Sequence, residues 1–97
     1  MARFIVLMDF TEQGIKNVKE SPKRAAAART AFKAKGVEIE QLYWTLGSHD
    51  VVAIVSAADG LDLAAVLLQL GGAGNVRTTT LRAFDEAEFN NVLSKLG

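Results

Sequence analysis

The sequence contains no cysteine, and it has a single histidine and a single proline. Without thiols, a disulfide framework, a thiolate metal centre and a cysteine nucleophile are all excluded. One histidine is also a poor basis for a metal site built by the chain itself. We therefore predict no metal site and no cofactor.

Long hydrophobic runs are also missing. No run approaches the length needed to cross a bilayer, and the apolar run at residues 4–8 is too short and too early for a signal peptide. The formal net charge is zero, because 11 basic residues balance 11 acidic ones. The basic residues crowd into residues 1–35, but no aromatic residues alternate with them, which argues against nucleic-acid binding. We expect a cytoplasmic protein whose partner is neither a membrane nor a nucleic acid.

The chain does have enough apolar sequence for one small core. Its length fits a single domain, residues 1–97, and 49% of the residues are hydrophobic. A chain of this length buries only about two-thirds of the surface that its unfolded form exposes. Association with further copies would therefore add to a modest core.

Four segments have the composition of strands. Two of them, residues 3–10 (RFIVLMDF) and 51–57 (VVAIVSA), are apolar on both faces, which is typical of strands covered on two sides. The other two mix apolar with charged or polar residues: 37–47 (VEIEQLYWTLG) and 75–84 (NVRTTTLRAF).

The segment 37–47 alternates, so its faces can be predicted. Leu42, Trp44 and Leu46 share one face, and Glu38 and Glu40 are expected at the start of that same face. The corner Gly-Ser-His-Asp then joins this strand to the next as a hairpin.

Three segments predict helices. Residues 11–36 carry two start signals, at Thr11 and at Ser21 before the only proline, and they end at a glycine. Residues 59–74 (DGLDLAAVLLQLGGAG) are so apolar that we expect this helix to be covered on more than one side. Residues 85–97 form an amphipathic helix with an apolar stripe at Phe89, Val92, Leu93 and Leu96.

The element order β-α-β-β-α-β-α predicts an α+β, ferredoxin-like βαββαβ fold with an extra C-terminal helix. Right-handed crossovers give a four-stranded antiparallel sheet in the order 4-1-3-2 and place both crossover helices on one face. The central strands are apolar on the other face too, and so large a bare patch is unusual for a monomer. We expect a second copy to cover it, in a face-to-face homodimer or a larger even-numbered oligomer.

Three segments that span most of the chain carry a family resemblance: TEQGIKNVKESPKR, GSHDVVAIVSAADG and GNVRTTTLRAF. They resemble the GYD family of small bacterial proteins, which is similar to the dimeric α/β-barrel superfamily. The resemblance implies ferredoxin-like subunits that pair face to face. Gly47 and Asp50 match the family's Gly-Tyr-Asp hairpin, whereas Ser48 and His49 stand where the family has a variable residue and a tyrosine. The hairpin is also similar to one in the ligand-sensing domains of Lrp/AsnC regulators, near their effector-binding subunit interfaces.

The candidate ligand-binding residues lie in and beside the hairpin: His49, Asp50, Tyr43 and Trp44. Each has a structural alternative, because turn aspartates accept backbone amides, a turn histidine is often only solvated, and a tryptophan is more often core than platform. Tyr43 and Trp44 point to opposite faces of the strand, and either one is a candidate lining for a cavity between two sheets.

A second candidate site, for an anion, lies near a helix start, at Lys16, Lys23 and Arg24. The alternative is that these side chains are simply solvated.

Two functions stay open at this point. The first is a binding or assembly module that senses a small molecule between its subunits. The alternative is a cofactor-free enzyme of the oxygenase or isomerase type, in which His49 or Asp50 moves a proton and Trp44 lines a pocket between the sheets. The sequence names neither a ligand nor a substrate.

Overall fold

Four antiparallel strands form one sheet in the order β2-β3-β1-β4 in the computed structural model, which describes residues 1–97. The strands are β1 (Ala2–Phe10), β2 (Glu38–Trp44), β3 (Val51–Ala57) and β4 (Val76–Ala83). The helices are α1 (Glu12–Lys16), the 3₁₀-helix η1 (Val18–Glu20), α2 (Ser21–Ala34), α3 (Gly60–Gly72) and α4 (Glu86–Leu93). The ferredoxin-like α+β fold and its strand order are as predicted.

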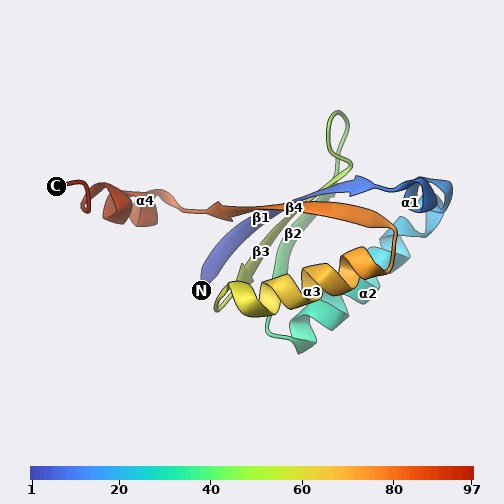
Figure 1. Ribbon diagram of the computed structural model, residues 1–97, viewed down its shortest axis with the longest axis horizontal. Coiled ribbons are helices and arrows are strands. Elements are labelled where there is room, and N and C mark those ends of the chain that lie inside the picture. Colours follow the sequence, from blue (N-terminus) through green and yellow to red (C-terminus); the bar gives the residue numbers. More distant parts are fainter.

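The two central strands are β1 and β3, the pair whose residues are apolar on both faces. On one face, Val6 lies opposite Ala53 and Met8 opposite Val51, and all four are buried. The helices α2 and α3 cover this face (Figure 1). The core of 12 buried residues also includes Phe32 of α2 and Leu63 and Val66 of α3.

Within the chain, helix α3 is covered only on the side that faces the sheet, so the predicted cover on a second side is not supplied by the chain itself. Leu63 and Val66 are buried, whereas Leu61 and Leu68 are each 78% exposed. The helix lies on the outside of a two-layer domain, so only the side that faces the sheet can pack. No other element of the chain covers the outer leucines.

A β-bulge in β2 overturns the predicted faces of that strand. Ile39 pairs with Val55 and Leu42 with Ala53, so three residues of β2 span two of β3, and the register shifts between Ile39 and Gln41. A bulge inserts one residue and reverses the alternation before it. Ile39 therefore joins Leu42 on the core face, where Glu38 and Glu40 were expected.

Hydrogen bonds hold the N-terminal helix α1 against the loop between α3 and β4. Thr11 caps α1 by accepting a hydrogen bond from the Gly14 amide (3.1 Å), and the Thr11 amide donates to the Asn75 carbonyl (3.1 Å). Gly14 itself lies directly against that carbonyl. Helix α2 starts at the predicted serine–proline pair, but its N-cap is Glu20 and Ser21 is the first helical residue.

Helix α4 lies beyond the end of β4 and covers neither face of the sheet (Figure 1). A capping box of Asp85 and Glu88 begins it. The face opposite α2 and α3 therefore has no covering element, and we call it the open face. Its apolar centre is formed by Ile5, Leu7, Val52, Ile54 and Leu81. No helix in the structure has the length and apolar character to cross a membrane.

We expect Gly14→Ala to lower the free energy of unfolding by about 1–3 kcal/mol, the usual cost of overpacking. The new Cβ would stand 2.0 Å from the Asn75 carbonyl oxygen, so α1 or the loop must move. Urea unfolding at one fixed protein concentration measures the change. Gly71→Ala in α3 is the control: its Cβ meets nothing within 4 Å, so it should be neutral or stabilising. If both substitutions change the free energy of unfolding equally, the close packing of α1 against this loop is contradicted.

Candidate functional site

The open face has an apolar centre between two polar ends. Ile5 pairs with Ile54 of β3 on one side and with Leu81 of β4 on the other, and Leu7 pairs with Val52. None of these side chains is fully buried. A contiguous apolar area of this kind on the surface of a small domain is a candidate binding surface.

One polar end holds a histidine–aspartate pair. The Nδ1 atom of His49, in the hairpin, lies 3.1 Å from Oδ1 of Asp9, at the end of β1. Because a carboxylate only accepts, it favours the form of His49 that carries its proton on Nδ1. The Nε2 atom makes no hydrogen bond within the chain. Asp9 was not among the predicted site residues, although a lone carboxylate in a strand otherwise apolar on both faces was a signal for it.

Asp50 faces the protein backbone and not a ligand space. Its Oδ2 accepts a hydrogen bond from the Phe10 amide (2.9 Å), and its own amide donates to the Met8 carbonyl (2.9 Å). These two bonds tie the hairpin to the end of β1. The geometry is that of the structural alternative, an aspartate that fixes a corner.

Tyr43 and Trp44 lie on opposite faces of β2, as their alternation predicts. Tyr43 pairs with Val52 of the open face, and its side chain is exposed. Trp44 pairs with the buried Val51, and its Nε1 donates to Oγ of Ser21 (2.9 Å). The structure thus separates Trp44 from His49, and the expectation that Trp44 lines a pocket between two sheets is corrected to a place under α2.

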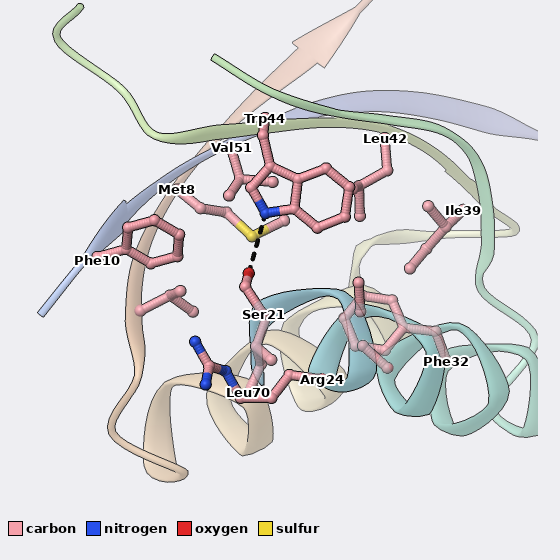
Figure 2. A pocket seen from close by; sticks show the side chains of 13 residues that line it. Met8, Phe10, Ser21, Arg24, Phe32, Ile39, Leu42, Trp44, Val51 and Leu70 are labelled. Carbon is pink, nitrogen blue, oxygen red and sulfur yellow. Dashed lines mark hydrogen bonds between the residues drawn. The ribbon is translucent and has the colours of Figure 1, made fainter. Parts of the chain in front are cut away.

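Trp44 covers a small cavity between α2 and the sheet (Figure 2). The cavity measures about 60 Å³, and its walls are apolar apart from Ser21 and Arg24. Ser21 is occupied by the Trp44 indole, and Arg24 donates to the Asn17 carbonyl (2.9 Å). The cavity therefore offers no free polar group that would orient or activate a substrate.

The candidate anion-binding residues do not converge on one point. Lys16 pairs with Glu12 (3.3 Å) along α1, Lys23 pairs with Glu20 (3.9 Å), and Arg24 is held by backbone carbonyls. Each cation thus has an acceptor within ten residues of it in the sequence. Anion binding here stays a prediction.

The other end of the open face carries an arginine–glutamate pair. Arg3 Nε donates to Oε1 of Glu40 (3.0 Å). The hydrogen bond with Glu40, and then the charge of that carboxylate, raise the pKa of Arg3, so it stays charged. Nowhere do three or more histidine, aspartate or glutamate side chains gather as potential metal ligands.

We expect Asp50→Ala to lower the free energy of unfolding by about 1–3 kcal/mol, because it removes a hydrogen bond to a charged acceptor and leaves the Phe10 amide without its partner. Urea unfolding followed by Trp44 fluorescence measures the loss. Ser48→Ala, at an exposed residue of the same corner, should change it by less than about 0.5 kcal/mol. An Asp50→Ala protein as stable as the wild type would rule out the structural role of this carboxylate.

Comparison with known proteins gives both a family and a fold. The GYD domain matches residues 4–93. A relative from Thermus thermophilus, named "Glutamine synthetase and cystathionine beta-lyase binding protein", is 33% identical over 89 residues, which cover 91% of this chain and 94% of the relative.

Two solved structures are similar. TTHA0845, also from Thermus thermophilus, is 26% identical with a TM-score of 0.57, and the match covers 88% of this chain and 95% of that one. MtbAldR has a TM-score of 0.68 at 15% identity, and the match covers 88% of this chain but only 52% of MtbAldR, so it shows the fold alone. The match over residues 4–93 and the Thermus thermophilus relative together show that this chain belongs to the GYD domain family.

Proposed function

We propose that the protein is a homodimeric protein-binding module whose two copies meet through their open faces. The observation that carries this proposal is the uncovered apolar centre of the sheet. A twofold pairing brings the same patch of each copy together, so one self-complementary surface serves both. The pairs His49–Asp9 and Arg3–Glu40 then lie at the rim, where interfaces are normally polar.

The partner of the dimer is proposed to be another protein. Support comes from the name of the Thermus thermophilus relative, which describes binding to glutamine synthetase and cystathionine beta-lyase. If the open face is occupied by the second copy, α3 still presents Leu61 and Leu68 to the solvent. We propose that α3 is the docking surface and that metabolic enzymes of these two kinds are its partners.

A second candidate is a small molecule held between the subunits, as a sensed ligand or as a substrate of cofactor-free proton transfer. The observation that favours it is the His49–Asp9 pair beside an apolar surface. The free Nε2 of His49 would act as the base, and Tyr43 on the same face would line the site. Native mass spectrometry of the freshly purified protein reports any retained molecule together with the number of copies.

For the dimer, sedimentation equilibrium should give the mass of two chains, or of a larger even number. Ile54→Lys should give a monomer, because it places a charge at the centre of the paired faces. Leu68→Lys makes the same chemical change on the outside of α3 and should leave the dimer intact. Circular dichroism checks that both variants fold. A monomeric wild-type protein at micromolar concentration would refute the homodimer.

For the partner, purified glutamine synthetase and cystathionine beta-lyase from the source organism should bind the immobilised wild-type dimer. Leu68→Lys should weaken binding by about tenfold or more, because a charge replaces a leucine at the contact. Thr30→Lys, at an exposed residue of α2, adds the same positive charge outside the proposed contact and serves as the control. If neither enzyme binds the wild-type dimer, the proposed partners are wrong.

A further inference from the structure

The C-terminal arm, residues 84–97, is held by contacts at its start, which we call its root, and is exposed along the rest of its length. The Arg82–Glu88 ion pair (3.4 Å) and the Arg82 guanidinium, 4.5 Å from the centre of the Phe84 ring, set the direction in which α4 leaves the sheet. Beyond that root, no hydrogen bond or ion pair joins the arm to another element. Its stripe is exposed by 51, 38, 46 and 69% at Phe89, Val92, Leu93 and Leu96.

Such an arm needs something to pack against. Helix α4 has 8 residues, and isolated helices shorter than about 12–15 residues are marginal in water. Amphipathic helices in proteins are stabilised mainly by packing of their apolar side. The chain's own sheet does not supply that packing, because α4 points away from it (Figure 1).

The exposed area of the chain matches what a second copy would cover. The structure exposes 6454 Å², whereas a compact monomer of this mass is expected to expose about 5,400 Å². The excess, about 1,000 Å², is comparable to the roughly 800 Å² that each partner buries in a standard interface. The radius of gyration, 14.6 Å, likewise exceeds the roughly 12.5 Å expected for a compact domain of this length.

The arm and the hairpin leave opposite ends of the sheet. The arm follows Ala83, which pairs with Arg3, whereas the hairpin, residues 45–50, precedes Val51, which pairs with Met8. The hairpin projects away from the helical layer (Figure 1), and Leu46 within it is fully exposed. A twofold axis across the strands would exchange the two ends and bring each arm to the hairpin of the other copy.

The charges at the two places are complementary. Glu86 lies in the first turn of α4, and Arg77 lies in β4 opposite Asp9, at the hairpin end of the sheet. Neither residue forms an ion pair within the chain. Opposite charges of this kind favour one orientation of two docking surfaces.

We infer that α4 is an exchanged arm, whose apolar stripe packs against the hairpin of the second copy around Leu46. The inference rests on the proposed homodimer and adds the element that closes its ends. Each copy then gives one arm and receives one. The same contact therefore covers the apolar stripe of α4 and the exposed Leu46 of the hairpin.

Leu93→Asp should raise the dissociation constant of the dimer by about tenfold or more, because the contact occurs twice and a charge replaces a buried leucine in each. Leu46→Asp should raise the dissociation constant to a similar extent. The double variant should lose less dimerisation free energy than the sum of the two single variants, because both substitutions disrupt the same contact. Asn91→Asp, on the side of α4 opposite the stripe, adds the same charge and should have little effect. Sedimentation equilibrium measures the wild type and all these variants.

The outcomes separate the arm from the dimer. A monomeric wild type would overturn the proposed dimer and the exchanged arm together. A wild-type dimer whose dissociation constant is unchanged by Leu93→Asp would overturn the arm alone. If Leu93→Asp instead lowers stability towards urea without changing the dissociation constant, the stripe packs within its own chain, and the inference is wrong.

Discussion

The structure depends on one mismatch between packing and connectivity. The central strands β1 and β3 are apolar on both faces, but right-handed crossovers place α2 and α3 on the same face of the sheet. The open face, which is formed by Ile5, Leu7, Val52 and Ile54, is therefore left without a helix. In a domain of this size, with a buried core of 12 residues, that face is a second apolar surface, and it is the surface that the proposed homodimer covers.

The sequence predicted what depends on local pattern and connection rules. Two strands apolar on both faces had to be central, and start signals at Thr11 and at Ser21 before the proline marked the starts of helices. The sequence analysis did not predict features that depend on a shift of one residue in strand register. The bulge beside Glu40 carries no composition signal, so the start of β2 was assigned to the wrong face. The apolar composition of α3 likewise could not tell which of its leucines face solvent.

The candidate site was predicted only in part, because its contacts also depend on the register of the sheet. The hairpin was identified, and Asp50 proved to bond the backbone of β1. The partner of His49 lies 40 residues away in sequence, and only strand pairing brings Asp9 to it. Trp44 was assigned to the face of β2 that holds Leu42, and the structure shows that this is the face under α2, with Ser21 as its partner. Contacts between distant segments follow from the register of the sheet, which the alternation of one strand does not fix.

Three apolar surfaces of the chain now have distinct proposed roles. The open face and the arm pair with a second copy, and the outer side of α3 remains for another protein. The polar pairs His49–Asp9 and Arg3–Glu40 frame the open face and would orient the two copies. This proposed division agrees with the name of the Thermus thermophilus relative, which is that of a binding protein.

The most direct test of the uncovered face is an isotope-filtered NOE measurement on a mixture of ¹³C-labelled and unlabelled protein. The account predicts intermolecular contacts from the methyl groups of Ile5, Leu7, Val52 and Ile54 to the same side chains of another copy. Methyl groups on this face that show contacts only with water, and none with a second chain, would contradict it.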